Sequence, residues 1–237
     1  KARAVQRGDL AVADVHYDAE QSFSPCPQMA GIKMTVAASA QEGAHTAKAD
    51  VTGAFINATP SRRVFLYTLE GTHMDDEDGT PMLLEQLSNL YGSKDAAYRW
   101  LHLAFEELER LGFSHSLWDP CLLRMSITGQ DELEKFIAES ESCSSKTDTA
   151  ATLTDDSVEG MASMHEGDQD IPEVIQFDFS KLIGAQPKNG EHDVFYIIAA
   201  IWVDDLLLVS NNLKLLKAML KRFLTRFPGT QEMNPNH

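Results

Sequence analysis

Two adjacent aspartates, Asp204 and Asp205, interrupt an apolar run near the end of the 237-residue chain, AIWVDDLLLVS at residues 200–210. An unpaired carboxylate in an apolar interior is unfavourable unless it is protonated, paired or bound to a cation. The β-type apolar segments VFYIIAAIWV and LLLVS flank the pair, which predicts a hairpin with the aspartates at its tip. The sequence therefore calls for a surface turn, a basic partner or a metal ion at this point.

The remaining patterns predict an α+β fold in which an antiparallel sheet carries helices packed on one face. Residues 96–112 place Trp100, Leu101, Ala104, Leu108 and Leu111 on one side of a helix, and Gly112 is a C-cap candidate. The other expected elements are a helix over 29–41, a strand entering a turn over 45–56, a half-buried strand over 61–69 and a basic amphipathic helix over 213–227.

The acidity of the chain is concentrated in residues 126–193. This segment holds 16 of the 36 acidic residues and only 4 of the 20 basic ones, and it is rich in Ser and Thr. Such a composition buries too little apolar surface to order a long segment. We therefore expect 126–193 to be an acidic, mostly disordered insertion, with a helix near Glu132–Glu139.

Composition narrows the class of protein further. The longest apolar run, Val194 to Val203, is about half the length of a membrane span, so no membrane partner is expected. The cysteines Cys26, Cys121 and Cys143 lie far apart, which disfavours a zinc site or a disulfide framework. The eight histidines form no metal-binding motif.

A third carboxylate completes a possible metal site. Asp50 follows the polar run AHTAKA and precedes VTGAFI, at the edge of an expected strand. Three carboxylates on neighbouring strand ends could hold two Mg²⁺ ions, which prefer hard oxygen ligands and can promote in-line phosphoryl displacement. A solvated turn remains the alternative, because aspartate favours turns.

Four blocks of the chain resemble, in order, those of copia-type retrotransposon reverse transcriptases. They are KADVTGAFIN (48–57), LSNLYGSKDAAYRW (87–100), LGFSHSLWDPCLL (111–123) and IWVDDLLLVSNN (201–212). The segments KARAVQRG and YDAEQSFSP near the start are also similar to the fingers of that family.

The resemblance implies a right-hand polymerase made of fingers and palm. It divides the chain into a fingers-like segment (1–45), a first palm part (46–125), the insertion (126–193), and the catalytic hairpin with its following helix (194–237), without thumb or RNase H. The implied activity is RNA-directed DNA synthesis, with dNTPs added to a primer 3′-hydroxyl on an RNA or DNA template. The implied setting is a gag-pol polyprotein also active in DNA integration, in the cytoplasm within a virus-like particle.

The resemblance also assigns roles to individual residues. Asp50 and Asp204 would be the direct ligands of two Mg²⁺ ions, for which Mn²⁺ can substitute, and Asp205 would be the third carboxylate. Phe55 would be the gate that excludes a 2′-hydroxyl, with a plain core phenylalanine as the alternative. Arg3 would contact the triphosphate, because its planar fork suits phosphate; a surface arginine is equally compatible with the sequence.

Two positions depart from the family pattern. The family has Tyr before Val-Asp-Asp, whereas this chain has Trp202, which keeps a large aromatic ring near the substrate but loses the phenol. The family's Gln-Ala-Pro-Arg block reads Asp95-Ala96-Ala97-Tyr98 here. An aspartate at position 95 would repel nucleotide phosphates unless a cation intervened.

Three functions remain open after these comparisons. The first is the polymerase itself, the second is an inactive or repurposed relic that acts as a binding module, and the third is an unrelated two-metal phosphoesterase. Nucleic-acid binding would draw on the following basic residues: Arg3, Arg7, Lys48, Lys214, Lys217, Lys221, Arg222 and Arg226. A solvated helix face is the alternative for the last five.

Overall fold

In the computed structural model, residues 5–68, 74–142 and 193–234 are described, and the structural statements below concern these residues. The helices are α1 (Met29–Glu42), α2 (Ala96–Arg110), α3 (Gln130–Ser142) and α5 (Leu213–Arg226), with 3₁₀ turns η1 (Gly8–Leu10), η2 (Ala19–Gln21) and η3 (Ala54–Asn57). The strands are β1 (His45–Val51), β2 (Phe65–Tyr67), β3 (Leu83–Glu85), β4 (Ser114–His115), β5 (Leu122–Thr128), β6 (Val194–Trp202), β7 (Asp205–Ser210) and β8 (Gly229–Asn234).

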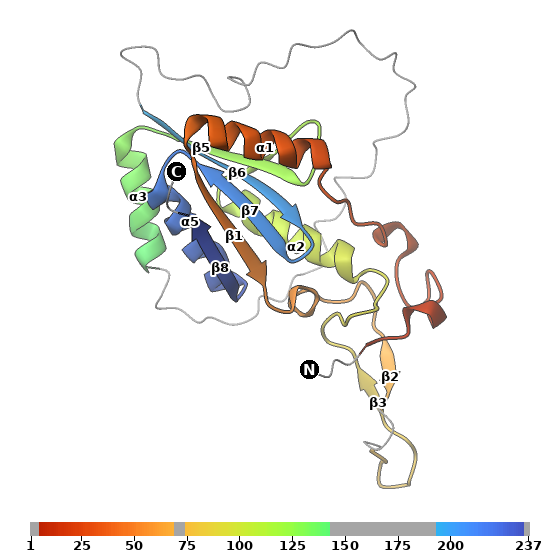
Figure 1. The fold of residues 1–237 in the computed structure, drawn as a ribbon. Helices are drawn as coiled ribbons and strands as arrows, with labels where there is room; N and C mark the ends of the chain where they lie inside the picture. Colours follow the sequence, from red (N-terminus) through yellow and green to blue (C-terminus); the bar gives the residue numbers. More distant parts are fainter. Residues whose placement is uncertain (1–4, 69–73, 143–192, 235–237) are drawn as a thin grey trace, which may run out of the picture.

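A six-stranded antiparallel sheet organises these elements, in the order β4-β5-β6-β7-β1-β8. Strands β2 and β3 form a separate two-stranded sheet that projects from the main body (Figure 1). The α+β class with an antiparallel sheet is therefore confirmed. None of the helices in the described ranges is long and apolar enough to cross a membrane.

The main core lies between one face of the sheet and helices α2, α3 and α5. Trp100 and Leu108 of α2 and Phe223 of α5 are fully buried there, together with Ala49 of β1 and Leu208 of β7. The expected face of α2 is confirmed, and Gly112 just beyond the helix has a φ of 99°, which glycine adopts without a steric penalty.

Helix α1 covers part of the opposite face of the sheet, so the sheet has helices on both sides rather than on one (Figure 1). Ala38 of α1 packs against Tyr196 and Ile198 of β6, whereas Ile197 and Ala199 face the main core. Strand β6 is therefore buried on both faces. This explains why its sequence is a continuous apolar run instead of an alternating one.

The acidic segment begins later than the sequence indicated. Residues 126–128 belong to β5, where Ser126 pairs with Tyr196, and α3 follows at once. Leu133 of α3 is buried in the main core, and Arg222 of α5 lies over the ring of Phe136. The expectation of an unpacked segment is therefore wrong for 126–142, although the expected helix near 132–139 is confirmed; residues 143–192 lie outside the described ranges.

The segment over 61–69 also differs from the expected half-buried strand. Of residues 61–68, which the structure describes, only Phe65–Tyr67 form a strand, and it pairs with the short β3 instead of joining the main sheet. Phe65 and Tyr67 are exposed because no helix covers this hairpin in the described residues. Alternation in the sequence predicted an inward face that the tertiary structure does not provide.

Candidate active site

Strand register brings two of the three predicted carboxylates together. Asp50 of β1 lies directly opposite Asp205, the first residue of β7, and Asp205 in turn lies opposite Trp202 of β6. Directly opposed residues of antiparallel strands point to the same face, with Cβ atoms roughly 4.5–5.5 Å apart. Trp202, Asp205 and Asp50 thus form a row across the end of the sheet, on the face opposite the main core.

Asp204 lies beside this row, in the two-residue turn between β6 and β7. The other turn residue, Val203, has a φ of 53°, which is uncommon for a β-branched side chain. The turn backbone is held from two elements: Val51 donates its N–H to the Asp204 carbonyl at 2.9 Å, and Trp100 donates its indole N–H to the Val203 carbonyl at 2.6 Å. The predicted hairpin is confirmed, with Asp204 in its turn and Asp205 at the start of its second strand.

Lys48 contributes a positive charge to the same face of β1. Its Nζ lies 2.9 Å from Oδ1 of Asp205, with side chains that are 57% and 48% exposed respectively. The hydrogen bond with Asp205 is the main cause that raises the pKa of Lys48, and the negative charges of Asp205, Glu232 and Asp50 add to it. The site is therefore a mixed-charge cluster rather than a bare group of carboxylates.

The donor set of this row can be tested against Mg²⁺. The ion commonly uses one or two carboxylates and completes its shell with water and substrate phosphates. The opposed carboxylates of Asp50 and Asp205 meet that requirement for one ion. Among the described residues, however, no group of three His, Cys, Asp or Glu side chains is placed to hold a metal, so the expected three-carboxylate site is not preformed.

Phe55 lies in η3, just beyond β1. The chain reaches it through Gly53, which adopts a left-handed conformation with a φ of 64°. The Phe55 ring is half-buried against the main core, and its centroid is 5.3 Å from that of Tyr91. Phe55 lies beyond the strand that carries Asp50. This location is compatible with a gate that excludes a 2′-hydroxyl and with a phenylalanine that only packs against the core.

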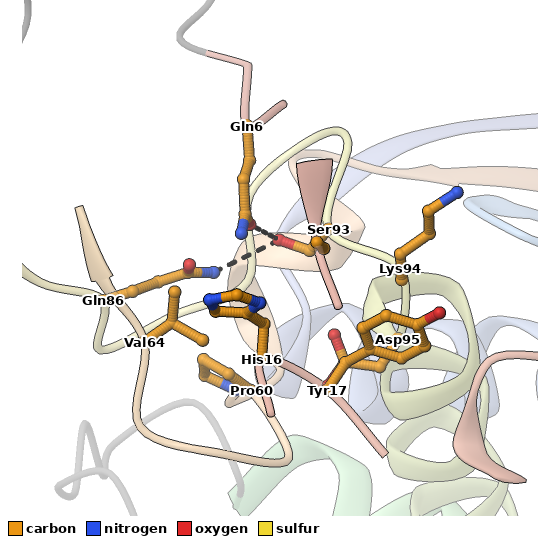
Figure 2. Close-up of a pocket in the computed structure, with 10 residues that line it drawn as sticks. Gln6, His16, Tyr17, Pro60, Val64, Gln86, Ser93, Lys94 and Asp95 are labelled. Carbon is orange, nitrogen blue, oxygen red and sulfur yellow. Dashed lines mark hydrogen bonds between the residues drawn. The ribbon is translucent and has the colours of Figure 1, made fainter. Parts of the chain in front are cut away.

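Asp95 occupies a different environment from the one expected of a phosphate-facing group. Its side chain is 3% exposed, and its Oδ2 accepts the backbone N–H of Ser61 at 2.8 Å. It lines a small polar pocket with residues from the N-terminal segment, among them His16 and Tyr17 (Figure 2). In this arrangement the carboxylate holds the loop after η3 against the start of α2.

Of the other predicted substrate contacts, Trp202 is 49% exposed on the row described above. Arg3 lies outside the described residues. Trp202 is therefore the predicted substrate contact that lies beside the carboxylates of Asp50 and Asp205.

A family model described as "Reverse transcriptase (RNA-dependent DNA polymerase)" matches residues 1–129, which is more than half of the chain. The chain belongs to this reverse transcriptase family. The matched region includes Asp50 but ends before the hairpin that carries Asp204 and Asp205. Neither the curated proteins nor the solved structures gave a match.

The basic residues expected to contact nucleic acid do not all lie beside Asp50 and Asp205. Helix α5 lies on the main-core side of the sheet, away from Asp50 and Asp205. Arg222 of α5 is 3.3 Å from Glu139, Arg7 is 2.6 Å from Asp9, and Lys48 pairs with Asp205. These three cations are already paired. The Arg222 side chain is only 14% exposed and lies over the Phe136 ring, so it packs between α5 and α3 and fits neither a phosphate contact nor a solvated helix face.

Two contributors to the candidate site were not foreseen from the sequence. The helical periodicity of α2 indicated that Trp100 is buried, but it gave no sign that the indole N–H holds the turn between β6 and β7. Lys48 was considered only as a phosphate contact. Its pairing with Asp205 depends on the β1–β7 register, which the expected strand over 45–56 did not define.

Proposed function

We propose that this chain is the fingers and palm portion of a copia-type, RNA-directed DNA polymerase that adds dNTPs to a primer 3′-hydroxyl. The observation that supports the proposal is the direct opposition of Asp50 and Asp205, beside the Asp204 turn, on a face of the sheet left open at that end. Membership of the reverse transcriptase family supplies the reaction class.

In this proposal the residues have distinct tasks. Asp50 and Asp205, with Asp204 nearby, would hold Mg²⁺ or Mn²⁺. A divalent ion bound there would neutralise charge on the attacking hydroxyl and on the triphosphate. Trp100 and Val51 fix the turn backbone so that the carboxylates keep their relative positions, and Trp202 offers an aromatic surface next to Asp205.

Primer extension on an RNA template tests this proposal. Wild type should extend the primer in Mg²⁺ or Mn²⁺, whereas Asp50→Asn and Asp204→Asn should lose activity by orders of magnitude with unchanged circular dichroism. Asp131→Asn, at the exposed start of α3, is the matched control and should match wild type. Extension by Asp50→Asn at the wild-type rate would overturn the assignment.

Phe55 allows an independent test of substrate choice. If its ring excludes the 2′-hydroxyl, Phe55→Ala should incorporate ribonucleotides more readily while keeping deoxynucleotide incorporation. If the ring only packs against the core, the substitution should lower thermal stability and leave the ratio of the two incorporation rates unchanged. The ratio, measured at a matched fraction of folded protein, separates the two roles.

The alternative function, a relic that binds partners without catalysis, is favoured by two observations. The described residues hold no preformed three-ligand metal group, and Lys48 already neutralises Asp205. Under this alternative the wild type would be silent at every metal concentration yet still bind an RNA–DNA hybrid, with an affinity that falls steeply with salt. Electrophoretic mobility shifts at two salt concentrations would detect that binding.

A further inference from the structure

Lys48 is surrounded by negative charge on the open face of the sheet. Asp205 is in direct contact with its ammonium, Glu232 lies opposite Lys48 on the neighbouring strand β8, and Asp50 is two residues further along the same face of β1. Three carboxylates from three strands therefore share one lysine, which lies on the same face as the Asp50–Asp205 pair.

The contact with Asp205 has a chemical consequence. An ammonium 2.9 Å from a carboxylate oxygen uses the lone pairs that a metal ion would otherwise use. A divalent ion held by Asp50 and Asp205 would have to replace this contact. The Lys48 side chain is 57% exposed on a flexible four-carbon stem, so it can move towards solvent without disturbing the core.

We propose that Lys48 is a tethered counter-cation that competes with the divalent ion for Asp205 and thereby sets the metal affinity of the site. The inference rests on the proposed function, because it takes Asp50 and Asp205 as the metal-binding pair. With the metal absent, the ammonium keeps the two opposed carboxylates from repelling each other across β1 and β7. With the metal bound, the ammonium is released on the same face.

A Mn²⁺ titration followed by electron paramagnetic resonance tests the competition without requiring catalysis. Removing the ammonium in Lys48→Met should tighten Mn²⁺ binding by about fivefold, the factor typical of the stronger exposed ion pairs. Lys48→Arg retains the cation and should stay close to wild type. Lys135→Met removes an equal charge from the exposed surface of α3 and should leave the affinity unchanged.

The outcomes separate the inference from the proposed function. If Asp50→Asn weakens Mn²⁺ binding but Lys48→Met behaves like Lys135→Met, the metal pair stands and the competition is refuted. Weaker binding by Lys48→Met would also refute it, since the lysine would then support the metal. If Asp50→Asn and Asp205→Asn both bind Mn²⁺ like wild type, the metal pair is wrong, and the competition is wrong with it.

Discussion

The two faces of strand β1 carry opposite chemistry within seven residues. Ala47, Ala49 and Val51 are buried against helices α2 and α5, whereas Lys48 and Asp50 are exposed on the other side. The first face is small and apolar because helices pack closely on it. The second carries charge because α1 does not extend over that end of the sheet (Figure 1). The same strand thus joins the core to the candidate site.

This difference teaches that the site is built on a rigid support. The two carboxylates on strands are adjacent in sequence to buried residues: Asp50 lies between Ala49 and Val51, and Asp205 precedes Leu206. The carboxylates therefore occupy positions that the core fixes, while their side chains remain in solvent. Substitutions on the two faces should consequently have separable effects on folding and on chemistry.

The largest expected loss of stability comes from placing a charge on the buried face of β1. Ala49→Asp places an unpaired carboxylate at a position that is 1% exposed, and it should lower the free energy of unfolding by several kcal/mol. Asp50→Ala changes the adjacent residue on the open face and should cost little stability. Urea denaturation of both variants measures the contrast; equal losses would mean that the two faces are not distinct.

Substituting the two tryptophans near the hairpin, Trp100 and Trp202, should have smaller and unequal effects on stability. Trp100→Phe removes the donor to the Val203 carbonyl and part of a buried ring, so it should cost about 1–3 kcal/mol. Trp202→Phe alters a half-exposed ring and should change stability by less than about 0.5 kcal/mol. Thermal denaturation compares them, and a stability ranking in the opposite order would contradict the buried anchor.

Replacing Val203, the strained residue of the turn, should stabilise the protein. Val203 adopts a left-handed backbone conformation that asparagine tolerates better than a β-branched residue. Val203→Asn should therefore raise the free energy of unfolding by about 1 kcal/mol. The same variant should bind Mn²⁺ no more tightly than wild type, because the gain concerns the backbone. A fall in the unfolding midpoint would show that the valine side chain contributes more than the strain costs.

The smallest expected effect is a dependence of stability on pH. It involves Tyr196, which lies on the part of the sheet that α1 covers. Burial, followed by the hydrogen bond to Glu42, raises the pKa of the Tyr196 phenol above its ordinary value near 10. Its stabilising contribution is therefore complete below pH 10 and is lost as the pH rises towards the higher pKa of the folded state. The stability of wild type should fall more steeply above pH 10 than that of Tyr196→Phe. Parallel curves from denaturant titrations at pH 8 to 11 would contradict this.

Local sequence patterns predicted much of the fold. The periodicity of 96–112 gave the buried face of α2, the apolar runs around Asp204 and Asp205 gave the β6–β7 hairpin, and the pattern of 45–56 gave a strand that enters a turn. These succeeded because each depends on residues close together in the chain. The start of the acidic segment was misplaced, since average charge over 126–193 concealed the few apolar residues, Leu133 and Phe136, that dock α3 onto the core.

The sequence by itself determined which carboxylates were candidates and that they should lie at strand ends, because strand patterns and turn chemistry are local. Only the tertiary structure decided the pairs: Asp50 with Asp205, Lys48 with Asp205, Asp95 with the Ser61 N–H, and Trp100 with the Val203 carbonyl. Each of these joins residues at least 34 positions apart. Their proximity follows from strand register and helix packing, which depend on the whole chain rather than on any single segment.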